Sequence, residues 1–68
     1  MANRIRYDVP EVIVYLGESR AAITLEEGTL IERSYLHGEV IWKIVGGGRD
    51  GWYLVASDRW VRRHTNAL

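Results

Sequence analysis

The sequence predicts an all-β fold, built as a small antiparallel barrel of about five to six strands. The apolar residues are mainly Val, Ile, Leu, Trp and Tyr, which are the types enriched in strands. They fall in short runs, and the seven glycines lie between these runs at spacings typical of turns. The chain has 68 residues, and a sheet this small protects its edges best by closing into a barrel. We therefore expect one domain over residues 1–68, with its core at about residues 9–64.

Five strands are expected along the chain. The first, Glu11–Leu16, is nearly continuous in apolar character and follows Pro10, which favours extended geometry in the residue before it. The other four are Thr29–Leu36, Val40–Val45, Gly51–Ala56 and Trp60–Arg63. Ala21–Leu25 is a weaker apolar segment, which we interpret as the returning arm of a loop.

Turn signals separate the last four expected strands: His37-Gly38-Glu39, Gly46-Gly47-Gly48-Arg49-Asp50 and Ser57-Asp58. Glycine reaches the positive φ values that tight connections need. The three consecutive glycines also suggest a phosphate-binding loop, but neither Gly-Lys-Ser/Thr nor the start of a helix follows them. The sequence therefore predicts a hairpin turn at this position.

Alternation along the strands assigns side chains to faces. In Val40–Val45, Lys43 marks the wetter face, so Trp42 on the other face is expected in the core. In Gly51–Ala56, Trp52 begins an apolar alternation, whereas Trp60 is bracketed by arginines. We therefore expect Trp52 to be buried and Trp60 to be partly exposed, so that Trp52 contributes more to stability. In Thr29–Leu36 neither face is cleanly apolar, which leaves its register open.

The chain has more large apolar side chains than one small core is expected to bury. The residues in excess are Ile41, Val45, Tyr53, Val55 and Trp60. Such residues would form an exposed apolar patch, and patches of this kind usually mark interaction sites. The patch favours a homo-oligomer or a complex with a partner protein.

Composition and charge exclude several classes of protein. Nine basic residues balance nine acidic ones, so no overall field favours nucleic acid or an anionic membrane. The segment Met1–Asp8 lacks the apolar stretch of a signal peptide, and no apolar run approaches the roughly 20 residues that span a bilayer. We expect a cytoplasmic protein without a membrane partner. With no cysteine and two histidines, no metal or cofactor is expected.

No catalytic arrangement is recognisable. Ser19, Ser34 and Ser57 lack a histidine and a carboxylate at the spacing of a known nucleophile arrangement. The acidic residues show no pairing that would favour general acid–base chemistry. The sequence therefore predicts a protein that is not an enzyme.

Five short pieces follow one another within residues 11–63: Val14-Tyr15-Leu16-Gly17, Thr24-Leu25-Glu26-Glu27-Gly28-Thr29, Trp42-Lys43-Ile44, Gly48-Arg49-Asp50-Gly51-Trp52 and Ser57-Asp58-Arg59-Trp60-Val61. Their order resembles that of the Src-homology-3 (SH3) barrel, and more closely that of its bacterial relatives, the SH3b domains. In that family an early strand is followed by a long acidic loop, three meandering strands, a short 3₁₀ turn and a last strand. Ala56 stands near the groove proline of the eukaryotic peptide-binding members, which argues against recognition of proline-rich peptides.

The resemblance implies a bacterial or phage module that binds a protein or peptide through an aromatic surface. Tyr15, Trp42 and Trp60 fall at or near positions that line the aromatic groove of peptide-binding members, although the periodicity of Trp42 favours the core. Glu18 lies on the expected long loop, where related domains pair with basic ligand residues. The expected partner-binding residues are Tyr15, Glu18, Trp42, Tyr53, Arg59, Trp60 and Arg62.

Two other functions stay open. Arg59, Arg62, Arg63 and His64 form a basic cluster beside Trp60, which could hold a nucleic-acid backbone and stack a base. The neutral total charge argues against strong binding of that kind. The third class is a bacterial or phage structural protein that assembles with copies of itself.

Overall fold

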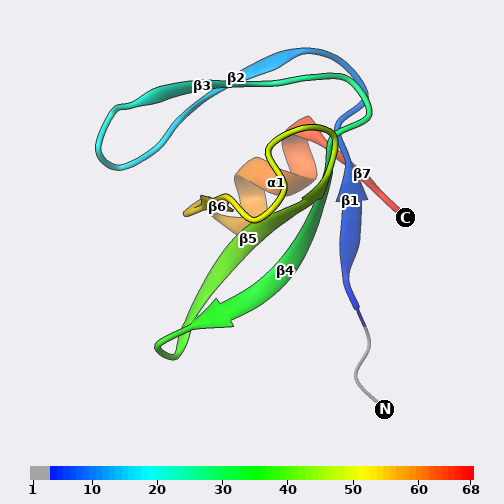
Figure 1. The fold of residues 1–68 in the computed structure, drawn as a ribbon. Coiled ribbons are helices and arrows are strands. Elements are labelled where there is room, and N and C mark those ends of the chain that lie inside the picture. The colour runs from blue at the N-terminus through cyan, green and yellow to red at the C-terminus, as the bar shows by residue number, and fades with distance from the viewer. Residues whose placement is uncertain (1–3) are drawn as a thin grey trace.

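The computed structural model describes residues 4–68, which form seven strands and one short helix (Figure 1). The elements are β1 (Arg6–Asp8), β2 (Ile13–Leu16), β3 (Ala22–Leu25), β4 (Leu30–Leu36), β5 (Glu39–Gly46), β6 (Tyr53–Leu54), α1 (Asp58–His64) and β7 (Asn66–Ala67). The predicted all-β class is confirmed. No helix within the described residues is long and apolar enough to cross a membrane.

The strands form two sheets in which every pair is antiparallel. The larger sheet has five strands in the order β6-β5-β4-β1-β7, and β2 pairs with β3 in a separate hairpin. Figure 1 shows this hairpin arching across one end of the larger sheet. Within residues 4–68 the hydrogen-bonded strands do not close into a continuous barrel, because β6 and β7 are the two edges of the larger sheet.

The longest hairpin, β4–β5, follows directly from the sequence. Leu36 pairs with Glu39, so the connection consists of His37 and Gly38 alone. Both residues have positive φ, 50° and 82°, as the tightest hairpin turns require at both central positions. The predicted turn is confirmed, with Glu39 already in the strand. The glycine segment after β5 also forms the expected antiparallel connection, because Lys43 pairs with Tyr53.

The core lies between the two sheets and α1. Its buried members are Val9, Tyr15, Leu25, Ile31, Trp42, Ile44, Leu54 and Val61. Trp42 is the largest of them and is only 1% exposed. Its ring meets Tyr7 edge-on, with centroids 5.4 Å apart, and its indole N–H donates to the Ala56 carbonyl (3.2 Å). The predicted core position of Trp42 is confirmed.

The expected strand Trp60–Arg63 is wrong, because this segment lies in the helix α1. The hydroxyl of Ser57 accepts a hydrogen bond from the Trp60 backbone N–H (3.1 Å), which is the standard N-cap arrangement. Asp58 stands in the first turn, and the last turn is basic, so the charges complement the helix dipole. Ser57-Asp58 was thus a helix start rather than a β-turn, and Val61 is the residue that the helix buries.

Three strands were not predicted as strands: β1, β3 and β7. β1 and β7 have three and two residues, which is too short for a period-2 pattern. β1 is held by its neighbours, since Tyr7 pairs with Ile31 on one side and Ala67 on the other. The expected loop arm at Ala21–Leu25 is instead the second strand of a hairpin, with Ile23 opposite Tyr15.

Two predicted orientations are also wrong. Trp52 was expected in the core, but it is 54% exposed, and the strand begins only at Tyr53. The Trp52 backbone N–H is used within the turn, where it donates to the Arg49 carbonyl (3.1 Å). Ile41 shares its face with the exposed Lys43 but is only 5% exposed, and it lies opposite Ser34 of β4.

Candidate functional site

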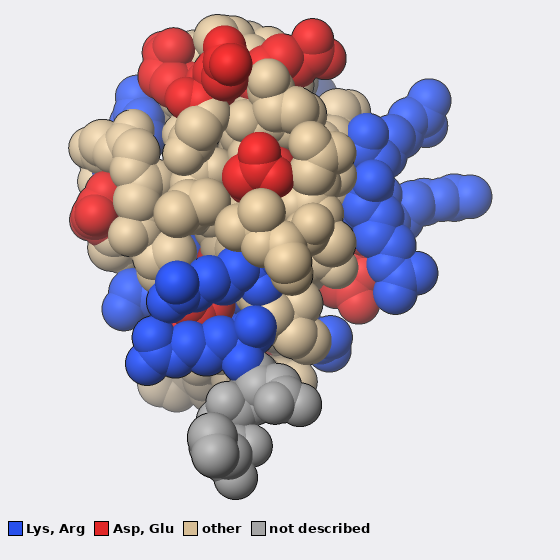
Figure 2. Space-filling model, turned by 90° about the vertical axis from the view of Figure 1, so that its right-hand side faces the viewer, with Lys and Arg blue, Asp and Glu red and all other residues tan. Residues whose placement is uncertain are grey.

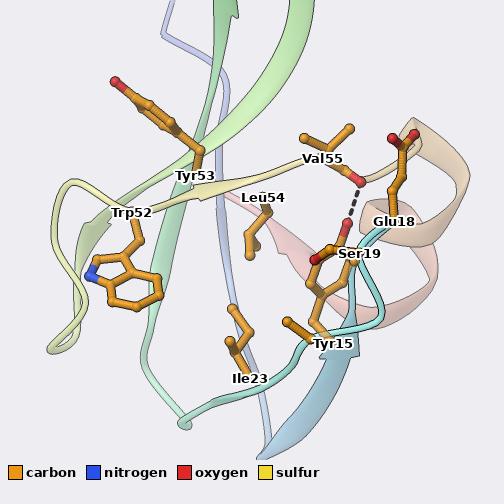
Figure 3. Close-up of a pocket in the computed structure, with 10 residues that line it drawn as sticks. Tyr15, Glu18, Ser19, Ile23, Trp52, Tyr53, Leu54 and Val55 are labelled. Atoms are coloured by element: carbon orange, nitrogen blue, oxygen red, sulfur yellow. Dashed lines mark hydrogen bonds between the residues drawn. The ribbon is translucent and has the colours of Figure 1, made fainter.

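A groove of about 470 Å³ lies between the β2–β3 hairpin and the segment that contains β6 (Figure 3). Pockets that bind small molecules and peptides through apolar walls commonly fall in this size range. The hairpin contributes Tyr15, Glu18, Ser19 and Ile23, and the other wall is Trp52–Val55. The groove is therefore built from two segments that are far apart in the sequence.

The hairpin is held against β6 by Tyr15. Its hydroxyl donates to the Val55 carbonyl, as Figure 3 shows at one end of the groove. Its ring meets Trp60 of α1 edge-on, with centroids 5.0 Å apart. Burial, and then the charge of Glu18, raise the pKa of Tyr15 above its ordinary value of 10.0, so the phenol remains a hydrogen-bond donor at neutral pH. Tyr15 thus fixes the width of one end of the groove.

The middle of the groove is apolar and aromatic. Leu54 is 1% exposed and forms the floor. Figure 3 shows Trp52 and Ile23 directed toward the same space, while Tyr53 projects to the other side of its strand. The guanidinium of Arg49 lies over the Trp52 ring, 5.0 Å from its centroid. The exposed indole is therefore oriented by a cation–π contact.

Charge on the groove is sparse. Among the described residues that line it, Glu18 is the only charged one. Its carboxylate lies at the hairpin tip, at the Val55 end of the groove (Figure 3). The tip is shaped by the bond from the Arg20 N–H to the Gly17 carbonyl (2.8 Å) and by a positive φ of 59° at Arg20. This single carboxylate favours ligands that carry one cationic group nearby.

The structure brings three of the seven predicted partner-binding residues into the groove: Tyr15, Glu18 and Tyr53. Trp42 is buried in the core, so it does not form a contact surface. Trp60 packs behind Tyr15 and against the core. Arg59 and Arg62 lie on α1 and do not line the groove.

Sequence reasoning missed Trp52 as a site residue, and it placed Val55 in the expected apolar patch but not among the partner-binding residues. Both are about half exposed and line the groove. The available signal for Trp52 was its place directly after the glycine turn, where regular alternation has not yet begun. Of the five residues expected in an exposed apolar patch, only Tyr53 and Val55 are exposed, each by about half; Ile41 is buried, and Val45 and Trp60 are partly buried.

A second feature is the basic face of α1. Arg59, Arg62 and Arg63 stand at positions i, i+3 and i+4, which share one side of a helix, and all three are exposed. Figure 2 shows basic side chains projecting along one side of the molecule and at its lower end, while acidic side chains gather at the top. At another basic position Arg6 is neutralised by Glu32, with Nε and Oε2 2.8 Å apart. Although the net charge is zero, basic and acidic side chains are thus gathered on different parts of the surface.

Within the described residues no group of three acidic or histidine side chains is placed to hold a metal ion. Comparison with known proteins finds no match: no protein-family model, no curated protein and no solved structure is significantly similar to this chain.

The structure reverses the predicted order in which Trp52 and Trp60 contribute to stability. Trp60 is half-buried, contacts Tyr15 and stacks on His64 with centroids 4.7 Å apart. We expect Trp60→Ala to lower the free energy of unfolding by about 2 kcal/mol, roughly half the cost for a fully buried aromatic. Trp52→Ala removes mainly the contact with Arg49 and should cost about 1 kcal/mol or less. Urea melts of both variants test this order, and a larger loss for Trp52→Ala would contradict the packing described above.

Proposed function

We propose that this protein is a non-catalytic binding module that recognises a protein or peptide partner through the groove between the β2–β3 hairpin and β6. The observation that carries this proposal is Trp52, an aromatic side chain that is 54% exposed and directed toward the apolar middle of the groove (Figure 3). Aromatic side chains of this kind supply most of the binding energy at protein interfaces. An aromatic side chain that is exposed to water does not stabilise the isolated fold, so its exposure indicates an interaction site.

The chemistry of the groove supports binding rather than catalysis. Ser19 is the one serine among its lining residues, and no histidine lines the groove with it. An activated serine needs a base within hydrogen-bond reach. The lining residues can therefore orient a ligand, but they do not form a nucleophile with its base.

We also propose that the fold is a member of the SH3-like barrels, near the SH3b domains. The order of elements supports this assignment, although the early strand is β1 and the last strand β7, not the segments Val14–Gly17 and Trp60–Arg63 that the sequence suggested. Between them lie a long connection that contains the β2–β3 hairpin, three meandering strands (β4, β5 and β6) and a short helix. The groove lies beside the long connection, which is where the resemblance places partner binding.

The test uses the folded chain as bait for a phage-displayed library of random heptapeptides. We expect selected peptides to lose affinity by about tenfold or more, equivalent to about 1.4 kcal/mol, when Trp52 is replaced by alanine. The matched control is Tyr35→Ala, because Tyr35 is also an exposed aromatic (65%) but lies at the end of β4, outside the groove. The proposed site would be contradicted if the selected peptides bound Trp52→Ala as tightly as Tyr35→Ala, or if the screen yielded no binders.

The alternative partner for this groove is a second copy of the same chain, which would form a homodimer. Sedimentation equilibrium of the wild type and of Trp52→Ala separates the two cases. A dimer that Trp52→Ala dissociates would make the partner the protein itself, whereas a monomer at all concentrations would leave a different protein or peptide.

The helix α1 favours nucleic acid as a second candidate partner, because it gathers three exposed arginines on one face. Three phosphate contacts would release only about three counterions and give weak binding with a shallow salt dependence. Titration of a fluorescent single-stranded DNA at physiological salt tests this candidate. Submicromolar affinity that is lost when Arg59, Arg62 and Arg63 are replaced by glutamine would favour nucleic acid over the groove.

A further inference from the structure

We propose that the groove binds its partner as an added β-strand: an extended peptide segment pairs antiparallel with the outer edge of β6, between β6 and the β2–β3 hairpin. This inference rests on the proposed function, because it specifies how the same groove recognises a peptide. It differs from recognition of a proline-rich helix, which relies on aromatic pockets rather than on main-chain pairing.

The first observation is that β6 is an edge strand. β5 is its one neighbour in the sheet, and the register places Leu54 opposite Trp42. The Ile44 N–H donates to the Trp52 carbonyl (2.9 Å). Because main-chain groups alternate in direction along an antiparallel strand, the Trp52 carbonyl and the main-chain groups of Leu54 face β5. Those of Tyr53 and Val55 consequently face the opposite way.

The second observation shows what lies on that outer side. The Val55 carbonyl accepts its hydrogen bond from Tyr15 of the hairpin, across the end of the groove (Figure 3). The outer edge of β6 therefore faces into the groove. The N–H and C=O of Tyr53 lie on this same edge, where no strand within residues 4–68 is paired. An open strand edge of this kind is a template for another chain.

The shape of the groove indicates a single extended segment rather than a second folded copy. The β2–β3 hairpin stands opposite β6 as the other wall, so a folded sheet that approached β6 edge to edge would meet the hairpin. One isolated strand has no further neighbours and fits between the walls. The side chains of such a strand alternate, so every second one would face the floor made by Leu54 and Ile23.

The charge of the groove completes the description of this partner. Glu18 is the only charged residue among the described residues that line the groove, and it lies at the Val55 end (Figure 3). A cationic side chain at one end of the peptide would neutralise it. The ligand we infer is an extended peptide with apolar residues at alternate positions and one lysine or arginine, and with free backbone N–H groups on the edge that meets β6.

The experiment is an N-methyl scan of the tightest heptapeptide selected on the folded protein, with affinity measured by isothermal titration calorimetry. N-methylation removes one backbone donor and leaves the side chain in place. We expect a loss of about tenfold or more at the position whose N–H meets the Tyr53 carbonyl, and less than about threefold at the positions beside it. Glu18→Gln should weaken binding of the cationic peptide and leave its neutral analogue unaffected. Hydrogen exchange of the Tyr53 amide should slow when the peptide is bound.

The outcomes separate the two proposals. Peptides that need Trp52 but tolerate N-methylation at every position, or that carry proline at alternate positions, would overturn strand addition and leave the groove as the binding site. An exchange rate at Tyr53 that the bound peptide does not change would also overturn strand addition. A selection that yields no peptide dependent on Trp52 would overturn both proposals.

Discussion

Replacing Trp42 with alanine is expected to leave most of the protein unfolded at room temperature. Truncating a fully buried tryptophan costs about 3–5 kcal/mol. A single core of this size typically supplies only about 3–5 kcal/mol of net stability. Trp42 also joins separate parts of the fold, because its ring meets Tyr7 of β1 and its N–H bonds the Ala56 carbonyl after β6. Its loss would loosen both connections together.

Far-UV circular dichroism and urea titration measure this effect. Trp42→Phe is the graded comparison: it keeps most of the apolar area and removes the hydrogen bond to Ala56, so we expect a loss of about 1–2 kcal/mol. Trp52→Ala serves as the control for loss of a tryptophan from the surface. A Trp42→Ala variant that still unfolds cooperatively with less than about 1 kcal/mol lost would contradict the central place of this residue.

Gly47→Ala is expected to cause the second large loss of stability. A Cβ atom at Gly47 would lie 2.7 Å from the Thr29 Cα and 3.0 Å from its Oγ1, so backbone would have to move. Gly47 also has a φ of +106°, which side chains disfavour. Thr29 cannot yield easily, because it is buried and its carbonyl accepts the Val9 N–H (2.9 Å). A shift there would disturb the start of β4 and the core residue Val9.

Gly48→Ala is the matched control for this prediction. Gly48 has a similar φ of +113°, but a Cβ there would meet nothing within 4 Å. It should therefore show the backbone strain alone, about 1–3 kcal/mol, and Gly47→Ala should cost at least about 2 kcal/mol more because of the clash. Thermal and urea unfolding of the two variants measure the difference. Equal losses would mean that the contact with Thr29 is not limiting.

Local patterns in the sequence were sufficient for much of the fold. The β4–β5 hairpin could be predicted because strong apolar alternation flanks a turn whose residues accept positive φ. The same alternation placed Trp42 in the core and Lys43 at the surface. These features depend on neighbours in sequence, so they can be predicted without the rest of the molecule.

The candidate site was predicted less completely. Tyr15, Glu18 and Tyr53 were expected to bind a partner and do line one groove. Trp52 was assigned to the core because alternation was extended backwards from Leu54 into a segment that is still a turn. Sequence periodicity cannot show where a strand starts when the turn before it ends in an aromatic residue, because aromatic residues are also common in strands.

The remaining features depend on contacts between distant segments. β1 and β7 are too short to carry a pattern of their own, and they become strands because each lies beside a partner already held in the sheet. The segment after Ser57 is apolar and aromatic enough for a strand, but a serine cap and the burial of Val61 favour the helix. The groove itself exists only because Tyr15 holds the hairpin against β6 from 40 residues away. Residue types along the chain therefore determine the β4–β5 hairpin and the core position of Trp42, whereas the edge of β6, the exposure of Trp52 and the basic face of α1 arise from the packing of the whole chain.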